Sequence, residues 1–186
     1  TPYYLDENLN NKKTYYYKIK ATDFFGNKSP FSKVQQAMPG LTSDRILLNC
    51  GSAQDRQRYN PANGRGFIGG HEVNYADGSV RQAFDAYKFL LKNGLYKVRL
   101  SFIEPLFKRP GKRLFSVSLN NTKVLPDFDI YRDAGTKEIS RSFITRVSDG
   151  LLTIRAKAKT ASTIISAIDI QAVHMCSAPD KIENLQ

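Results

Sequence analysis

A regular alternation of apolar and polar side chains through residues 94–170 constrains this chain more than any other feature. In residues 94–104 every second position is apolar, and Lys97, Arg99 and Ser101 lie between these positions. A period of two residues is that of a β-strand with one face in a core and the other in solvent. The pattern therefore predicts strands packed around a buried core.

The same period returns in three later segments, residues 113–119, 151–154 and 164–170. Asn120 and Asn121 supply a turn after the first of them, because Asn tolerates the positive φ of a tight hairpin. We expect these segments to form an all-β fold, a two-sheet antiparallel β-sandwich. The predicted core residues are Tyr96, Val98, Leu100, Phe102, Phe115, Val117, Leu119, Ile154, Ile168 and Ile170.

Composition limits the classes of partner. The 186 residues carry 28 Lys and Arg against 17 Asp and Glu, a formal charge of +11 that is spread over the chain. Such a surface attracts nucleic acids, membranes or acidic polysaccharides. Outward Lys and Arg also keep strands from aggregating, and we favour this interpretation. Aromatic and basic residues interleave only at residues 15–18, so no nucleic-acid site is expected. The absence of a long apolar run predicts no membrane span.

Five motifs follow one another along the larger part of the chain: GLYKVRLSFIE at residues 94–104, GKRLFSVSLNN at 111–121, DFDI at 127–130, DGLLTI at 149–154 and ISAIDI at 165–170. With residues 49–52 ahead of it, this series resembles the malectin-like carbohydrate-binding modules over residues 44–172. The resemblance implies a jelly-roll-like malectin sandwich. It also implies a module that binds oligo- or polysaccharides and does no bond chemistry.

The two ends of the chain resemble a different module. Residues 1–40 resemble the last strands of a fibronectin type III module plus a linker, with Tyr15 as its tyrosine corner. Residues 177–186 resemble the start of another such module, and residues 41–176 hold the malectin-like sandwich. An isolated hairpin is marginal in water, so we expect the hairpin within residues 1–40 to pack on another surface.

Modules of these two kinds adjoin in secreted bacterial glycoside hydrolases. The resemblance thus implies an accessory module of a secreted or cell-surface polysaccharide-degrading enzyme, whose catalytic domain lies elsewhere in the parent protein. A structural spacer or protein-interaction module without sugar binding is the alternative.

Sugar binding needs exposed rings that stack on the apolar face of a pyranose, with polar groups at the rim. Residues 52–80 contain three turn signals and predict a long surface excursion, where binding groups usually sit. Each candidate ring either stacks on the sugar or pins its loop to the sandwich. Arg65 and Arg109 favour acidic glycans if they line the site, by a preference that salt screens. The candidate binding residues are Tyr59, Phe67, Tyr75, Phe107 and Arg109.

The chain also departs from the family pattern. The two rings that follow the first strand motif in the family are Leu106 and Phe107 here, so one ring is lost. The family's ligand-contacting Asp before the last strand has no counterpart in residues 160–163. The resemblance therefore does not transfer the sugar specificity of animal malectin.

Motifs for catalysis, metals and cofactors are weak. Residues 64–69 match G-x-G-x-x-G, but a dinucleotide site needs a strand before and a helix after, so we interpret them as a loop. The family resemblance makes Asp127 and Asp129 caps of backbone amides, and no catalytic residue is expected. His71 and His174 lack ligand spacing, which predicts no metal site, although sandwich modules of this kind sometimes carry a structural calcium.

The two cysteines leave two interpretations open. Cys50 and Cys176 form a disulfide if the first and last strands of the sandwich are neighbours. Otherwise Cys50 is a small buried residue and Cys176 a free thiol. We favour the second interpretation, because burial is the usual state of a lone cysteine.

Overall fold

A computed structural model describes residues 13–37 and 45–173 of the chain. The described residues fall into two compact units, the smaller within residues 1–43 and the larger within residues 44–173. Each unit is described by itself.

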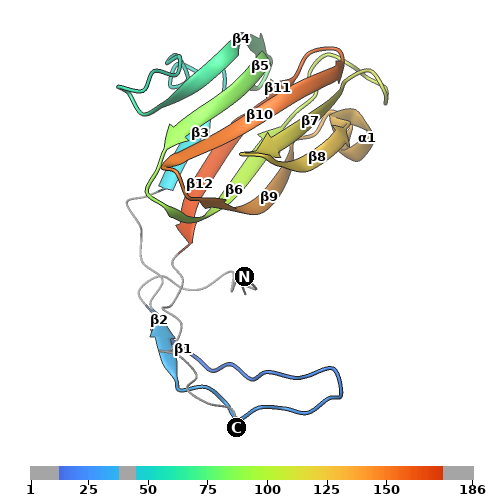
Figure 1. The fold of residues 1–186 in the computed structure, drawn as a ribbon. Coiled ribbons are helices and arrows are strands. Elements are labelled where there is room, and N and C mark those ends of the chain that lie inside the picture. Colours follow the sequence, from blue (N-terminus) through green and yellow to red (C-terminus); the bar gives the residue numbers. More distant parts are fainter. Residues whose placement is uncertain (1–12, 38–44, 174–186) are drawn as a thin grey trace. The chain divides into compact units, whose positions relative to one another are not determined.

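The larger unit is built from two antiparallel sheets that face each other (Figure 1). The four-stranded sheet has the order β3 (Arg45–Asn49), β12 (Ala167–Val173), β6 (Gly94–Phe102) and β9 (Ile139–Val147). The six-stranded sheet has the order β11 (Ile164–Ile165), β5 (Gly78–Leu90), β10 (Leu151–Thr160), β7 (Leu114–Leu119) and β8 (Thr122–Phe128), and β4 (Arg65–Tyr75) pairs with β5. The predicted fold class is confirmed.

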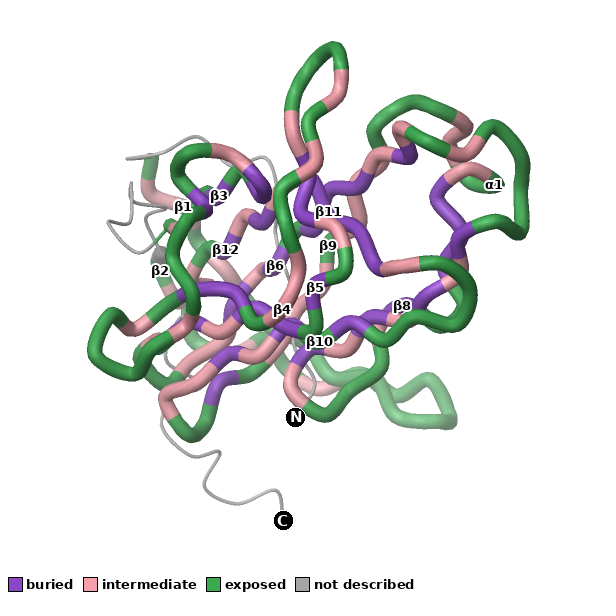
Figure 2. The backbone as a smooth tube through the Cα atoms, turned by 90° about the horizontal axis from the view of Figure 1, so that it is seen from above, coloured by how far each residue is buried: buried purple, intermediate pink, exposed green. Residues whose placement is uncertain are grey.

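The core lies between the sheets, and all ten predicted core residues are buried. In one sheet Ile168 lies directly across from Leu100, and in the other Ile154 lies across from Leu119, so each inward row is continuous. Figure 2 shows buried positions along the strands and exposed positions in the connecting loops. The alternation therefore fixed the inward faces correctly, because a slip of one residue moves a strand's apolar set into solvent.

The segment predicted as a long surface excursion is different in the structure. Residues 65–75 form β4, which pairs with β5 in a long hairpin. The glycines of the G-x-G-x-x-G match serve this strand, because Gly66 has φ of 149° and a Cβ there lies 2.5 Å from the backbone nitrogen of Tyr59. The pairing shifts register between Ile68 and Gly69, a bulge at a glycine of positive φ. The loop interpretation of residues 64–69 was wrong.

The smaller unit contains a short antiparallel pair, β1 (Tyr15–Tyr17) and β2 (Gln35–Ala37). Both strands are shorter than the alternation in residues 15–21 and 32–37 predicts. The Asp23 carboxylate accepts hydrogen bonds from the backbone N–H groups of Phe25 and Asn27, which closes the expected turn. Phe24 is 98 % exposed, so the turn presents apolar surface to solvent. The module predicted within residues 177–186 lies outside the described residues.

Candidate functional site

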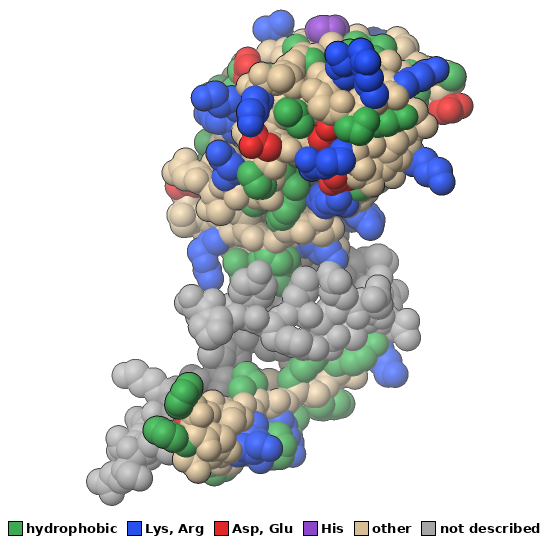
Figure 3. Space-filling view, turned by 90° about the vertical axis from the view of Figure 1, so that its right-hand side faces the viewer, with side chains coloured by type: hydrophobic (Ala, Val, Ile, Leu, Met, Phe, Trp, Pro, Cys, Tyr) green, Lys and Arg blue, Asp and Glu red, His purple; other side chains and the backbone are tan. Residues whose placement is uncertain are grey.

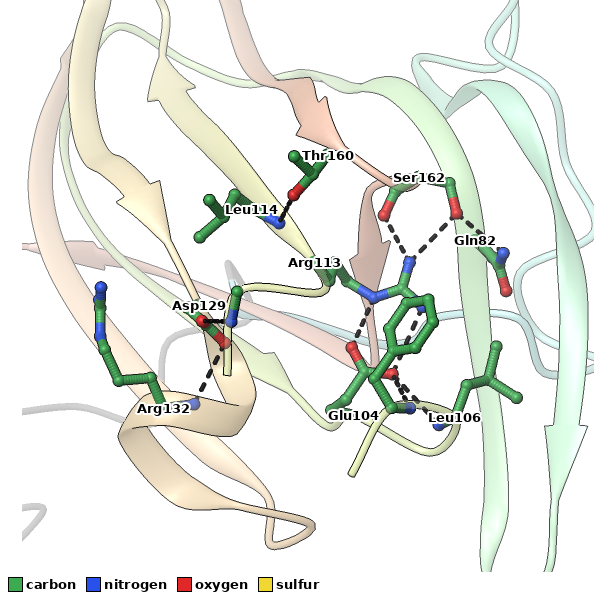
Figure 4. Close-up of polar contacts among 11 residues, drawn as sticks. Gln82, Glu104, Leu106, Arg113, Leu114, Asp129, Arg132, Thr160 and Ser162 are labelled. Atoms are coloured by element: carbon green, nitrogen blue, oxygen red, sulfur yellow. Dashed lines mark hydrogen bonds and ion pairs between the residues drawn. The ribbon is translucent and has the colours of Figure 1, made fainter. Parts of the chain in front are cut away.

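The loop after β6 is fixed by a buried carboxylate. Glu104 is 1 % exposed, and its Oε1 accepts hydrogen bonds from the backbone N–H groups of Leu106 and Phe107, both at 3.1 Å. Its Oε2 accepts a hydrogen bond from Nε of Arg113 at 2.5 Å. One side chain thus determines the backbone path of the loop and holds the strand that follows it (Figure 4).

Arg113 joins this loop to a distant segment. Its side chain is buried, and Nη1 donates to the carbonyl and, at 3.1 Å, to the hydroxyl of Ser162. The Gln82 amide donates to the same hydroxyl at 2.8 Å. In Figure 4 Arg113 lies between Glu104 and Ser162. The guanidinium also lies 5.1 Å from the centre of the Phe107 ring. Three distant parts of the sequence therefore meet around one arginine.

The far end of the loop has its own anchor. The Gly111 N–H donates to Oδ2 of Asp129 at 2.6 Å. Oδ1 of Asp129 accepts from the N–H of Arg132 at 3.1 Å and so caps the short helix α1 (Ile130–Ala134). The loop between Glu104 and Arg113 is consequently held at both ends.

The exposed part of this loop combines apolar and cationic side chains. Leu106 is 54 % exposed and Phe107 is half-buried, so the loop presents apolar surface beside the Arg113 network. Lys108, Arg109 and Lys112 are exposed. A rigid loop with an accessible ring and polar neighbours is a suitable place for a weakly polar ligand.

Polar groups lie next to the ring on the strand side. Gln82 and Ser162 are half-buried and bonded to each other. His71 lies directly across from Gln82 in the pairing of β4 with β5, and it is exposed. We call Leu106, Phe107, His71, Gln82 and Ser162 the loop site. Its hydroxyl, amide and imidazole groups supply both donors and acceptors.

Phe67 corrects the predicted site. It is only 6 % exposed, and the Arg81 guanidinium covers its ring at 3.5 Å from the ring centre. Its other neighbours include the ring of Tyr87. A ring enclosed in this way has no face free for a sugar. Phe67 packs inward because it belongs to a strand of the sandwich and not to a surface loop.

Tyr59 lies at the other end of the hairpin from Tyr75. The Tyr59 N–H bonds to the carbonyl of Phe67, whereas Tyr75 lies eight residues further along β4, next to the turn. At about 3.3 Å per residue these positions are about 26 Å apart. Tyr59 is half-buried beside Lys88, 5.2 Å from the ring, and the exposed Arg65 begins the same end of β4. Tyr59 and Tyr75 therefore do not share one sugar-sized site.

Tyr75 is closer to the loop site. It pairs with Gly78, four residues along β5 from Gln82, or about 13 Å. Burial raises the pKa of Tyr75, and the nearby Glu138 and Asp77 add to this shift, so its hydroxyl is a neutral donor at neutral pH. Of the predicted residues, the structure brings Phe107 and Arg109 together on one loop and leaves Tyr75 at its margin.

Sequence reasoning missed Arg113, Ser162 and Gln82. Arg113 interrupts an otherwise apolar and small-residue strand motif within residues 111–119, and this signal marks it as special. Gln82 and Ser162 carry no such signal, because they are 80 residues apart in sequence and meet only in the folded chain.

A second buried polar network lies within the sandwich. Oδ2 of Asp55 accepts hydrogen bonds from Arg81 at 2.7 Å, from the Tyr87 hydroxyl at 2.6 Å and from the Gly51 N–H at 2.8 Å. Burial raises the pKa of Tyr87, as do the neighbouring Cys50 and Asp55, so the phenol stays protonated. This network fastens the segment that precedes β4 and has no exposed partner.

Cys50 is a buried thiol beside this network. Burial raises the pKa of the Cys50 thiol far above its ordinary value, which keeps the sulfur protonated and unreactive. The structure thus agrees with the interpretation of Cys50 as a small buried residue. Cys176, the proposed disulfide partner, lies outside the described residues, as does His174.

The paired aspartates have different roles. Asp129 is buried and caps backbone amides, as the family resemblance predicts. Asp127 is exposed and pairs with Lys159 at 3.1 Å, so its predicted capping role was wrong. Within residues 13–37 and 45–173, no three potential metal ligands lie close enough to hold an ion. No helix of these same residues has the length and apolar character that crossing a membrane requires.

Fold and site together define an all-β sandwich module with a rigid, partly apolar loop at its edge. The malectin domain family model matches residues 75–173, more than half of the chain. The protein belongs to the malectin domain family. No curated protein matches it significantly.

Several solved structures share the fold. A Bacteroides uniformis beta-glucuronidase superposes with a TM-score of 0.63 at 18% identity, over 87% of this chain and 23% of that chain. The ANXUR2 extracellular domain from Arabidopsis thaliana gives a TM-score of 0.57 at 15% identity, over 76% of this chain and 50% of that one. The plant receptor-like kinase FER gives 0.54 at 19%, over 70% and 42%. At these identities the likeness establishes the fold alone, and this chain spans half or less of each structure.

Proposed function

We propose that this protein is a non-catalytic carbohydrate-binding module and that the loop site binds the sugar. The observation that carries the proposal is the anchoring of residues 105–112 by Glu104 at one end and Asp129 at the other. This anchoring holds an accessible ring in place before any ligand arrives. A pre-formed site loses little conformational freedom on binding, which matters for a ligand as weakly bound as a sugar.

The chemistry of the loop site fits a pyranose. Phe107 offers a ring with one side toward the Arg113 guanidinium, and Leu106 extends the apolar surface beside it. Gln82, Ser162 and His71 offer groups that hydrogen-bond hydroxyls in either direction. Tyr75 is placed for a neighbouring sugar unit. Tyr59 and Phe67 are not part of the proposed site, because the first lies at the far end of β4 and the second is covered.

The wider setting is part of the proposal. Fibronectin type III modules before and after the sandwich, a secreted or cell-surface location and a parent polysaccharide-degrading enzyme are supported by the motifs at the two ends of the chain. The Bacteroides glucuronidase with the same fold is consistent with such a parent. No calcium site is proposed on the described residues, because they hold no suitable cluster of ligands.

Isothermal titration with a panel of neutral and acidic oligosaccharides tests the function. We expect dissociation constants in the μM to mM range, about −8 to −4 kcal/mol. Phe107→Ala should abolish binding while the melting temperature stays close to that of the unmodified protein. Tyr59→Ala is the matched control, since it removes a half-buried ring outside the site and should leave binding unchanged. Failure of the unmodified protein to bind any glycan would contradict the proposal.

A protein-interaction module is the second candidate, and the smaller unit favours it. The turn between β1 and β2 exposes Phe24 and Phe25, and Phe31 is exposed beyond it. Such rings mark contact surfaces. Light scattering after size-exclusion chromatography, on the full chain and on one that begins at Leu41, tests this candidate. Association of the full chain alone supports it, and identical monomers contradict it for self-association.

A further inference from the structure

The loop that carries Phe107 also carries an unneutralised cluster of cations. Lys108, Arg109 and Lys112 lie within five residues of one another and are all exposed. The ion pairs of the described residues include none of these three side chains. The acidic residue of this segment, Glu104, is buried and bonded to Arg113. The neighbouring carboxylate Asp129 is buried and accepts backbone N–H groups.

These cations cannot move far from the ring. The backbone of the loop is held at Leu106, Phe107 and Gly111 by the hydrogen bonds to Glu104 and Asp129. Side chains on so short an anchored loop stay within a Debye length, about 10 Å at 0.1 M salt, of anything that contacts Phe107. Three charges of one sign therefore raise the local concentration of anionic ligands.

We infer that the loop site selects anionic glycans, those with uronic-acid carboxylates or sulfate groups, over neutral ones. The inference rests on the proposed function, because it names the ligand class of the same site. Arg109 supplies a planar fork that matches a carboxylate or sulfate in two hydrogen bonds, and Lys108 and Lys112 add point charges. Phe107 contributes the stacking surface that a bare anion cannot use.

General electrostatic attraction is the effect to be separated from this one. Figure 3 shows Lys and Arg side chains over the whole visible face of the larger unit, with acidic side chains among them. The outer face of the six-stranded sheet offers a matched set, Lys123, Arg155 and Lys157. Arg155 lies across from Ser118, which lies across from Lys123, and all three cations are exposed and outside the ion pairs of the described residues.

The experiment compares one glycan in two charge states. A uronic-acid oligosaccharide and its carboxyl-reduced form have the same length and linkages but differ in charge. Binding of both is measured for the unmodified protein, for the loop variant K108Q/R109Q/K112Q and for the sheet variant K123Q/R155Q/K157Q. We expect the unmodified protein and the sheet variant to prefer the acidic form by about tenfold or more at low salt. The loop variant should lose the preference and keep its affinity for the reduced form.

The outcomes separate the two proposals. Binding of the reduced form with equal affinity to the acidic form overturns the anionic selection but leaves carbohydrate binding standing. Absence of binding to either form overturns the proposed function. Equal loss of preference in both variants assigns it to net charge and overturns the role of the loop. A single-stranded oligonucleotide bound as tightly as the uronic-acid glycan also overturns the inference, because it shows a site for polyanions of any kind.

Discussion

Two buried ion pairs in this sandwich have the same parts and different consequences. Arg81 bonds to Asp55 with its guanidinium 3.5 Å from the Phe67 ring, and Arg113 bonds to Glu104 with its guanidinium 5.1 Å from the Phe107 ring. The first ring is enclosed, whereas the second is half-exposed. The first arrangement closes a core, and the second holds a loop at the surface. The comparison teaches that exposure of the ring, and not the ion pair, marks a candidate binding site.

The largest expected effect comes from breaking the enclosed pair. Arg81→Met leaves the Asp55 carboxylate buried without its cation, which should lower the free energy of unfolding by about 3–5 kcal/mol. Phe102→Ala, a large truncation in the core, should cost a similar amount. Urea denaturation measures both. Arg99→Met, at an exposed position of β6, is the control and should stay within about 0.5 kcal/mol. A loss below about 1 kcal/mol for Arg81→Met would show that the pair does not hold the core.

Breaking the second pair should have a smaller and more local effect. Glu104→Gln leaves Arg113 with its acceptors on Ser162, so we expect a loss of about 1–3 kcal/mol. The loop should loosen as well, and amide hydrogen exchange at Leu106 and Phe107 should accelerate while exchange in β4 is unchanged. Glu72→Gln, at an exposed position of β4, is the control. Unchanged exchange in the loop would contradict the anchoring on which the proposed function depends.

The smallest expected effect on stability distinguishes the two rings directly. Phe107→Ala removes a half-buried ring and should cost about 1 kcal/mol, whereas Phe67→Ala removes an enclosed one and should cost about 3–5 kcal/mol. The binding effects should run the other way, since only Phe107→Ala removes a ring from the loop site. Similar stability losses for the two variants would place Phe107 in the core and remove it from the candidate site.

The sequence predicted the strands better than the connections between them. The alternation in residues 94–104 and 113–119 identified the inward residues of β6 and β7, because a one-residue period has only one register that buries the apolar set. Residues 64–69 misled, because glycine-rich stretches are typical of loops. Here they are needed where the backbone of residues 57–59 approaches β4 too closely for a Cβ.

The candidate site was predicted only in part for a similar reason. Phe107 was found because it follows a strand motif at a fixed distance, and Arg109 because it lies on the same loop. Phe67 and Tyr59 were assigned to a common site on loop context alone, and β4 separates or buries them. Nothing local in the sequence shows which aromatic residues of a hairpin face outward once a bulge has shifted the register.

The sequence by itself determined the fold class, the core residues and the loop that carries Phe107, because these depend on local periodicity and on short motifs. Only the tertiary structure decided which groups surround that ring. The hydrogen bonds of Arg113 to Ser162 and of Gln82 to Ser162 span 49 and 80 residues of sequence. Such contacts exist only when the two sheets have packed, since the burial of the core fixes where the strand ends and their loops meet.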